Sequence, residues 1–467
     1  MKILLTVHQF LPEFGAGTEI LTFEVAKGLQ RLGHEVCVFT GFNARRELRD
    51  EDRFDEYVYE GILVKRFHHA YVPMGGQNNV TEAEYRNLLV ARYFRNLLEK
   101  MNPDVVHFFH LARLSASLVE VCSELGIPTV LTPTDFWFVC PTNQLRLSDG
   151  SMCRGPGWNA TNCVRHLVEL NQPEDTKAQI RNLSDWRLGL TVWANQRGIT
   201  KSGWYGEHID ALTQRHVYLR EQFNKIDRVL VPTHLMERIL TSNGLSPDGI
   251  VFAPYGLNLT YLRRHPRTAT RDLLRIGFIG TLYEHKGVDV LVKAVSSLDV
   301  SLPVELKIFG DTKDFPVFFA RLKELAGSDP RIQFCGTFPN LAIGEILASL
   351  DVLVVPSVWY ENTPLVIYSA QAAGCPVIAS NLGGMAEVIH HEDNGLLFTP
   401  GCAAELAEAI KRLCNNRDLV EYLANRAIVP RSIEDYVLQI EAVYEDVTVA
   451  PPMPIQNCEG MVGPDNI

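Results

Sequence analysis

Two α/β domains, each with a doubly wound parallel sheet, are the fold class that the sequence predicts. The chain has 467 residues, which is more than one hydrophobic core usually supports. Short aliphatic runs alternate along it with amphipathic stretches, an order that is typical of parallel sheets covered by helices. The series strand, glycine-bearing loop, helix, strand occurs at residues 2–40 and again at residues 274–309. The pattern therefore restarts in the second half.

The composition narrows the class of protein. It is 46% hydrophobic and 21% charged, as in soluble globular proteins, and its net charge of −11 argues against nucleic acid as a main partner. The chain contains no run of eighteen apolar residues, and its first apolar run suits a strand better than a signal peptide. Ten cysteines in a chain of this length do not make a disulfide scaffold. A reduced, cytoplasmic setting is expected.

The first half carries the pattern of one domain. Pro12–Gly17 separates the first strand from the first helix, and Gly15 and Gly17 allow a close approach of a ligand because no Cβ intervenes. A tight strand-to-helix turn is the alternative explanation of these glycines. Strands are expected at residues 2–7, 35–40, 61–67, 104–109, 128–131 and 225–232, and helices at residues 18–32, 82–100, 114–126 and 234–243.

The second half repeats this pattern. Strands are expected at residues 274–279, 304–309, 333–338, 352–355 and 376–380, and helices at residues 287–298, 364–373, 404–424 and 432–445. The expected organisation is a domain at 1–250 with an insertion at about 136–225, a domain at 251–430, a helix at 431–449 and a disordered tail at 450–467.

Two loops of the second half carry candidate binding chemistry. Lys286 lies just before a helix, where its charge and the free helix N–H groups suit a diphosphate, although a solvated lysine is the alternative. Glu361 and Asn362 follow the strand at 352–355, and Pro364 opens the next helix. Both loops are expected at the carboxyl end of the sheet, where such folds bind ligands.

The second loop belongs to a longer pattern that indicates a family. From Ser357 to Glu387 the chain reads S-x-W-x-E-N-x-P-L-V-I-Y-x-A-x-A-A-G-x-P-V-I-A-S-x-x-G-G-M-A-E. This resembles the donor-site segment of family 4 glycosyltransferases, which are retaining enzymes of the GT-B fold. The resemblance implies two Rossmann-like doubly wound domains facing a cleft, with the last helix crossing back onto the first domain.

The resemblance also implies an activity and a set of site residues. A sugar would move from a nucleoside-diphosphate-sugar (a UDP- or GDP-sugar) to the hydroxyl of a glycan or lipid-linked acceptor, without a catalytic metal, in polysaccharide, glycolipid or other glycoconjugate synthesis. The expected place is the cytoplasm, including the inner face of the membrane. The implied residues are Glu361, Lys286 and His110 for catalysis, Asp135 on the acceptor side, and Gly15, Gly17, Thr281, Lys286, Glu361, Asn362, Thr363, Pro364, Leu365 and Ser369 for donor binding.

Three positions depart from the family pattern. Thr134 stands where relatives commonly have histidine, Thr281 where arginine is usual, and Ser369 where a second glutamate is usual. All three are expected in the site, so an inactive homologue that binds a sugar nucleotide or a glycan is the alternative function. For His110 a satisfied structural histidine is the alternative role.

A loop in the insertion suggests a structural metal. Cys140, Cys153, Cys163 and His166 follow one another as C-x12-C-x9-C-x2-H, and the close spacing of the last pair is common in structural zinc sites. Free or buried thiols are the alternative, because the other gaps are wider than in most zinc motifs.

Overall fold

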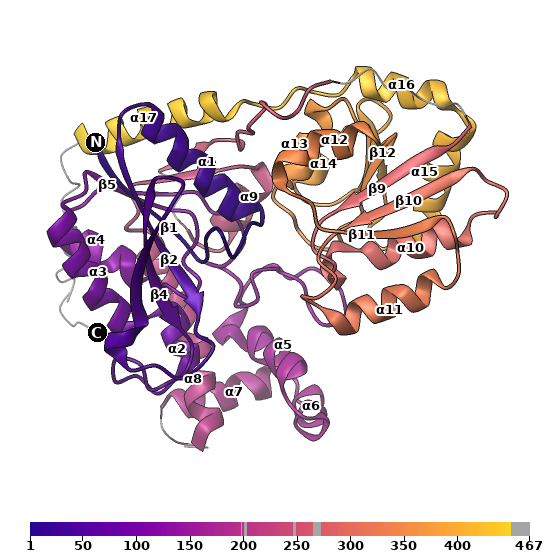
Figure 1. Cartoon of the computed structure of the whole chain (residues 1–467). Helices are drawn as coiled ribbons and strands as arrows, with labels where there is room; N and C mark the ends of the chain where they lie inside the picture. The colour runs from indigo at the N-terminus through magenta and orange to yellow at the C-terminus, as the bar shows by residue number, and fades with distance from the viewer. Residues whose placement is uncertain (198, 200–202, 246–248, 265–271, 450–467) are drawn as a thin grey trace, which may run out of the picture.

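The computed structural model describes residues 1–197, 199, 203–245, 249–264 and 272–449. Among these residues two separate sheets form, each covered by helices on both faces, and the two halves lie side by side (Figure 1). The predicted fold class, two Rossmann-like α/β domains, is confirmed. The predicted tail at 450–467 lies outside the described residues.

The first sheet has eight strands in the order β3-β4-β2-β1-β5-β6-β7-β8. All neighbours are parallel except β3 and β4. The strands are β1 (Lys2–Val7), β2 (Glu35–Asn43), β3 (Phe54–Tyr59), β4 (Ile62–His69), β5 (Val105–Phe108), β6 (Thr129–Leu131), β7 (Arg228–Val231) and β8 (Ile250–Phe252). The order reverses between β1 and β5, which makes their carboxyl ends the switch point of this sheet.

The second sheet has six strands, all parallel, in the order β11-β10-β9-β12-β13-β14. They are β9 (Leu274–Ile279), β10 (Val304–Phe309), β11 (Ile332–Gly336), β12 (Val352–Val355), β13 (Val377–Ser380) and β14 (Gly395–Phe398). Here the order reverses between β9 and β12, so a second switch point lies at their carboxyl ends.

Seventeen α-helices are described. In the first half they are α1 (Gly17–Arg31), α2 (Val80–Tyr85), α3 (Leu88–Met101), α4 (Ser117–Leu125), α5 (Thr161–Asn171), α6 (Glu174–Arg181), α7 (Asp185–Gln196), α8 (Gly203–Phe223) and α9 (His234–Ser242). In the second half they are α10 (Val288–Ser297), α11 (Pro316–Ala326), α12 (Ile343–Ala348), α13 (Leu365–Ala372), α14 (Met385–Val388), α15 (Ala403–Asn415), α16 (Arg417–Asn425) and α17 (Ile433–Val449).

Burial on both faces explains the continuous apolar strands. Along β1, Ile3 and Leu5 pack in one cluster with α1 and α17, whereas Leu4 points to the opposite cluster with α3 and α4. Alternate residues of a strand face opposite sides, so both sets must be apolar when helices cover both faces.

The last helix joins the two halves. As the resemblance implies, α17 returns to the first domain, where it packs on α1 (Figure 1). Gly28 permits this approach, because a Cβ there would lie 2.6 Å from Val437 Cγ2. Tyr444 lies 2.6 Å from the buried ring of His107, which also contacts Thr132 at 2.9 Å. His107 is therefore a satisfied structural histidine.

The element prediction missed β8, β14, α11, α12 and α14, and three further details of it were wrong. The helix expected at 82–100 is two helices, because the side chain of Asn87 accepts hydrogen bonds from Leu89 N and Val90 N and starts α3 anew. The helix expected at 404–424 likewise breaks where Asn416 caps α16. Strand β3 was missed, because it is an antiparallel edge strand with only partial burial.

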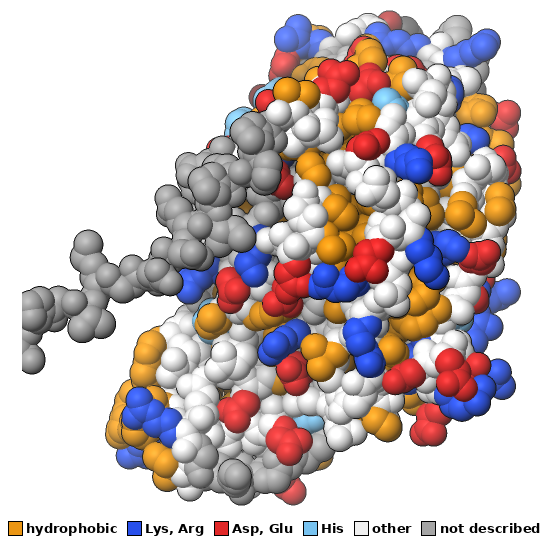
Figure 2. Space-filling model, turned by 90° about the vertical axis from the view of Figure 1, so that its left-hand side faces the viewer, with side chains coloured by type: hydrophobic (Ala, Val, Ile, Leu, Met, Phe, Trp, Pro, Cys, Tyr) orange, Lys and Arg blue, Asp and Glu red, His pale blue; other side chains and the backbone are white. Residues whose placement is uncertain are grey.

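The insertion is mostly helical. After a loop, α5, α6, α7 and α8 form a separate layer that extends below the first sheet and the space between the halves (Figure 1). Among the described residues, none of the helices combines the length and apolarity that crossing a membrane requires. The face in Figure 2 mixes acidic and basic side chains without a large area of one sign.

Candidate functional site

A salt bridge lies at the switch point of the second sheet. Lys286 ends a single 3-10 turn (Glu284–Lys286) after β9, and Glu361 lies in the loop after β12. Because β9 and β12 are neighbours, the two loops meet, and Lys286 Nζ lies 2.6 Å from Glu361 Oε1. The side chains are 24% and 9% exposed, so the pair is largely withdrawn from water.

Three donors converge on one oxygen of this carboxylate. Besides Lys286, the Ser357 hydroxyl donates to Glu361 Oε1 at 2.8 Å and Trp359 Nε1 donates at 2.7 Å. Burial alone would raise the pKa of Glu361, but the charge of Lys286 and these hydrogen bonds outweigh it and lower the pKa below its ordinary value. Glu361 is therefore held as a carboxylate, with Oε2 outside these three bonds.

Glycines allow the loops to meet. A Cβ on Gly287, which has φ +66°, would lie 1.9 Å from the Pro356 carbonyl oxygen. A Cβ on Gly384 would lie 1.9 Å from the carbonyl oxygen of Asn362, and Gly384 N donates to Glu361 O at 2.9 Å. Any side chain at either position would displace a backbone carbonyl that positions the salt bridge.

Helix α13 presents its N-terminus beside Glu361. Pro364 is its N-cap and no side chain caps it, so its first backbone N–H groups remain available to an anionic group. Ser369 lies in the second turn, 3% exposed, and its hydroxyl donates to Leu365 O at 3.0 Å. Thr363 is buried and Thr281 is exposed.

Asn362 connects this loop to the first domain. Its side-chain nitrogen donates to the carbonyl oxygen of Thr134 at 2.8 Å, and its oxygen lies 3.4 Å from the hydroxyl of Thr233. A Cβ on Gly17 would lie 3.9 Å from Leu365, so the glycine loop of the first domain faces the start of α13, whereas Gly15 contacts Leu11 of its own loop. Two of the three family departures, Thr134 and Ser369, thus lie at or next to this junction.

The switch point of the first sheet holds a group of titratable side chains. His8 follows β1 and His110 follows β5, and their ring centroids lie 4.2 Å apart. His110 Nδ1 accepts a hydrogen bond from Ala112 N at 3.1 Å. Its Nε2 therefore carries the proton and donates to Asp135 Oδ2 at 2.7 Å.

The second histidine of this group contacts a buried glutamate. His8 Nε2 lies 3.4 Å from Glu19 Oε1, longer than an ordinary charge-assisted hydrogen bond. Burial lowers the pKa of His8 well below its ordinary value, with contributions from His110 and Arg113, so the ring is neutral. Burial also raises the pKa of Glu19. His8 and Glu19 are therefore held less tightly than the side chains around Glu361, whereas His110 and Asp135 form an equally short contact.

Several residues of the junction were missed from the sequence. Ser357 and Trp359 form the hydrogen-bond shell of Glu361, and both belong to the quoted motif, which was the signal that could have found them. Gln144, from the insertion, lies 3.4 Å from His285 Nδ1. Burial, together with the charges of Lys286 and Arg146, lowers the pKa of His285 to about 4. No local pattern marks Gln144, because only the tertiary fold brings the insertion to this loop.

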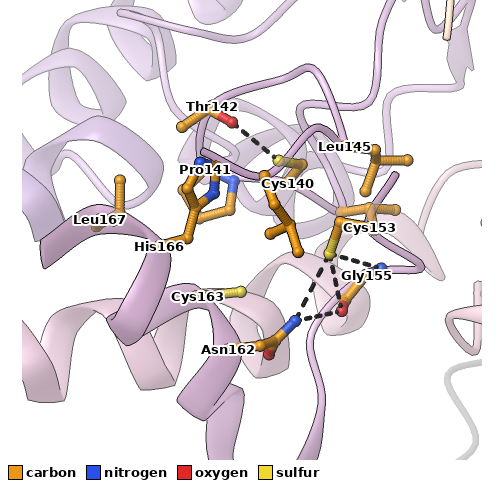
Figure 3. A pocket seen from close by; sticks show the side chains of 12 residues that line it. Cys140, Pro141, Thr142, Leu145, Cys153, Gly155, Asn162, Cys163, His166 and Leu167 are labelled. Atoms are coloured by element: carbon orange, nitrogen blue, oxygen red, sulfur yellow. Dashed lines mark hydrogen bonds between the residues drawn. The ribbon is translucent and has the colours of Figure 1, made fainter. Parts of the chain in front are cut away.

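The predicted zinc ligands are brought together but do not form a metal site. Cys140, Cys153, Cys163 and His166 line one cavity of about 10 Å³ (Figure 3). The sulfur of Cys140 lies 3.2 Å from the Thr142 hydroxyl. The sulfur of Cys153 accepts from Gly155 N at 3.4 Å and from Asn162 Nδ2 at 3.6 Å.

The structure gives the zinc prediction no support. Within the described parts of the chain, no three His, Cys, Asp or Glu side chains are arranged to hold a metal ion. The cavity is about the size of one water. Burial raises the pKa of the Cys163 thiol to about 12. The alternative of free and buried thiols fits this part of the structure better.

The fold and the two switch-point sites define a protein of the GT-B class. Solved GT-B structures align with nearly the whole chain. Sucrose-phosphate synthase from Thermosynechococcus elongatus has a TM-score of 0.63 at 17% identity, over 96% of this chain and 100% of that one. HepE from Anabaena in complex with UDP and glucose has a TM-score of 0.62 at 15% identity, over 95% and 99%. At these identities the likeness concerns the fold alone.

The sequence comparisons give the family. Residues 15–152 match Glycosyltransferase Family 4, and residues 274–416 match Glycosyl transferases group 1. The chain belongs to the group 1, or family 4, glycosyltransferases.

Curated relatives support the same family. An uncharacterized glycosyltransferase of Methanocaldococcus jannaschii is 31% identical over 33% of this chain and 40% of its own length. The D-inositol 3-phosphate glycosyltransferase of Nocardia farcinica is 26% identical over 57% of this chain and 62% of its own length. The GDP-mannose-dependent alpha-mannosyltransferase of Mycobacterium tuberculosis is 26% identical over 92% and 93%. The chain thus matches less than two thirds of the first two relatives and nearly all of the third.

Proposed function

We propose that this chain is a retaining glycosyltransferase that moves a sugar from a nucleoside diphosphate to an acceptor hydroxyl. The observation that carries the proposal is the buried Lys286–Glu361 pair beside the uncapped N-terminus of α13, at the switch point of the second sheet. The cation and the free N–H groups suit a diphosphate, and the fixed carboxylate suits the hydroxyls of a sugar.

The groups on the second domain would stabilise the leaving diphosphate and bind the sugar. In the transfer, the bond from the anomeric carbon to the phosphate oxygen breaks and a bond to the acceptor oxygen forms on the same face. The leaving diphosphate would take the acceptor's proton. Lys286 and the N–H groups of α13 would stabilise the negative charge that develops on the diphosphate, and Glu361 would accept hydrogen bonds from the sugar.

The remaining predicted site residues would hold the donor and the acceptor. Thr281, Thr363, Ser369 and the backbone from Asn362 to Leu365 would line the donor, with Gly15 and Gly17 closing over its phosphates. His110 and Asp135 would orient the acceptor hydroxyl from the first domain, since they lie at the facing switch point. These groups supply charge stabilisation without a divalent cation, so we propose that the chemistry needs no metal.

We propose a UDP- or GDP-sugar as donor and a glycan or lipid-linked molecule as acceptor. Support for both bases comes from relatives: the Anabaena protein is described with UDP and glucose, and the mycobacterial relative as GDP-mannose-dependent. The place of action would be the cytoplasm, at the inner face of the membrane where the acceptor is lipid-linked.

Release of nucleoside diphosphate tests the proposal. The full chain is incubated with a panel of UDP- and GDP-sugars and a mixture of glycan acceptors, with and without EDTA. We expect release from at least one donor, unchanged by EDTA and reduced at least tenfold by Lys286→Ala. Failure of every donor, or loss of activity in EDTA, would contradict it.

The second candidate function is a binding protein that has lost turnover. Ser369 favours it, because the hydroxyl already donates to Leu365 O where relatives have a carboxylate for the ribose. Calorimetry on the same panel separates the two candidates. Binding of a sugar nucleotide without release of diphosphate would favour the binding protein.

A further inference from the structure

Among the side chains that the structure describes, three tryptophans are exposed on the insertion. Trp158 is 62% exposed, Trp186 60% and Trp193 36%, and Leu190 between the last two is 49% exposed. Positions 186, 190 and 193 recur at the spacing of one face of a helix, so they form a single apolar stripe along α7. Large apolar side chains gathered on a surface mark an interaction site.

Trp158 extends this stripe. A Cβ on Gly189 would lie 2.0 Å from Trp158 Cζ3, so the indole packs directly on the backbone of α7. The opposite face of α7 is already covered, since Leu188 and Val192 are buried in the small core of the insertion. The exposed stripe of Trp158, Trp186, Leu190 and Trp193, which we call the tryptophan strip, lies outside this small core.

Two arginines accompany the tryptophan strip. The guanidinium carbon of Arg187 lies 5.4 Å from the centre of the Trp186 ring, and that of Arg197 lies 4.2 Å from the centre of the Trp193 ring. Within the parts of the chain that the structure describes, neither arginine forms an ion pair.

The acidic residues nearby are mostly engaged elsewhere. Residues 161–199 hold five Lys or Arg and four Asp or Glu, in a chain of net charge −11. Three of the four acidic residues pair with other arginines: Asp185 with Arg165, and Glu169 and Glu174 with Arg181. Over residues 161–199 the described basic residues without an ion pair are Lys177, Arg187 and Arg197, and two of these three accompany the tryptophan strip.

We propose that the tryptophan strip docks on the surface of an anionic lipid bilayer. Indole rings favour the boundary between head groups and acyl chains, and arginines beside them can bind lipid phosphates. A helix of twelve residues, about 18 Å long, lies in this boundary with its apolar side inward. The positive charge of the insertion complements anionic lipid, whereas the strongly negative remainder of the chain does not.

Docking by this face would bring the domain junction to the bilayer. The same insertion reaches the donor side, where Gln144 contacts His285. In Figure 1, α5, α6 and α7 lie below the space between the two halves. This consequence rests on the proposed function and suits an acceptor that is itself carried in the bilayer, but docking does not depend on turnover.

Vesicle co-sedimentation of the full chain tests the proposal. We expect binding to phosphatidylcholine vesicles that contain phosphatidylglycerol, and at least tenfold weaker binding to phosphatidylcholine alone. Trp186→Ser with Trp193→Ser should weaken binding to the anionic vesicles at least tenfold. Arg187→Gln and Arg197→Gln should each weaken binding to the anionic vesicles about fivefold. Added salt should remove this difference between the wild type and the arginine variants.

The matched control lies on the second domain. Tyr422 is 48% exposed and the guanidinium of Arg426 lies 5.7 Å from its ring, so it repeats the chemistry of the strip away from the insertion. Tyr422→Ser should leave vesicle binding unchanged. Circular dichroism and nucleoside diphosphate release with a soluble acceptor establish that the tryptophan variants are folded. If the wild type releases no nucleoside diphosphate, that result would count against the proposed function and not against docking on lipid.

Three results would overturn docking on lipid. These are full binding by the double tryptophan variant, equal binding to neutral vesicles, and a wild-type dimer that the tryptophan substitutions dissociate in the absence of any vesicle binding. The last would make the strip an interface between two copies of the chain.

Discussion

Both domains place titratable side chains at the switch point of their sheet, but the two groups differ in how firmly their charges and contacts are fixed. On the second domain, Glu361 has three donors on one oxygen and a lowered pKa, so its charge is fixed before any ligand arrives. On the first domain, His8 is neutral, Glu19 has a raised pKa, and the contact between them is 3.4 Å long.

The difference shows where preorganisation is needed. A side that must stabilise charge developing on a diphosphate gains from fixed charges, because these need not reorganise during the reaction. A side that receives an acceptor hydroxyl can leave polar groups incompletely paired until the ligand supplies their partners. The predictions below separate the two sides, from the largest expected effect to the smallest.

Removing the donor-side carboxylate should have the largest effect. Glu361→Ala leaves Lys286 without its buried partner, which is expected to lower the free energy of unfolding by about 3 to 5 kcal/mol. It should also lower kcat/KM at least tenfold, about 1.4 kcal/mol. Urea unfolding and initial rates measure the two effects. Glu305→Ala, which breaks a more exposed pair with Lys307, is the control and should change neither by much. If Glu361→Ala unfolds and turns over as the wild type does, the assignment of Glu361 to the site is wrong.

Acid should destabilise the donor side through His285. Its pKa is about 4 in the folded chain against about 6.5 when unfolded, so between these values only the unfolded chain binds the proton. The stabilising contribution is therefore complete above pH 6.5 and is lost as the pH falls towards 4, by up to about 3 kcal/mol. His285→Gln should flatten the pH dependence of unfolding by this amount, whereas the exposed His234→Gln should not. An unchanged slope in His285→Gln would contradict the burial argument.

Restoring the missing carboxylate should strengthen nucleotide binding. Ser369→Glu would offer both ribose hydroxyls a charged acceptor, and a charge-assisted hydrogen bond is worth about 1.5 to 3 kcal/mol, so affinity for UDP or GDP should rise about tenfold or more. Ser369→Ala, which removes only the bond to Leu365 O, should bind as wild type. Calorimetric titration measures both variants. Unchanged or weaker binding by Ser369→Glu would mean that the buried pocket is shaped around serine.

The acceptor side should give the smallest effect and a different kinetic signature. Asp135→Asn keeps the shape of the group that accepts from His110 Nε2 but removes its charge. We expect the KM for acceptor to rise about fivefold, about 1 kcal/mol, with the KM for donor unchanged. Steady-state kinetics with each substrate varied in turn decide this. A rise in the KM for donor instead would mean that Asp135 acts on the donor and not on the acceptor.

Local sequence determined the elements and much of the site. Buried aliphatic runs indicated the central strands of both sheets, since residues facing helices on both sides must all be apolar, but they did not mark β3, β8 or β14. Pro364, Gly374 and the motif around Glu361 marked the loop and helix on which the donor side is built. The sequence predicted poorly where a single polar side chain decided the outcome, as at Asn87, whose side chain caps the start of α3.

Only the tertiary structure decided which of these residues meet. Lys286 and Glu361 are 75 positions apart, and they form a pair because β12 lies beside β9 in the sheet. The contact of Gln144 with His285 likewise depends on where the insertion packs. The four predicted zinc ligands did converge on one cavity, but ligation needs directions and distances that sequence spacing does not carry. Spacing along a chain sets which side chains can be neighbours within an element, whereas sheet order and loop packing set the neighbours between elements.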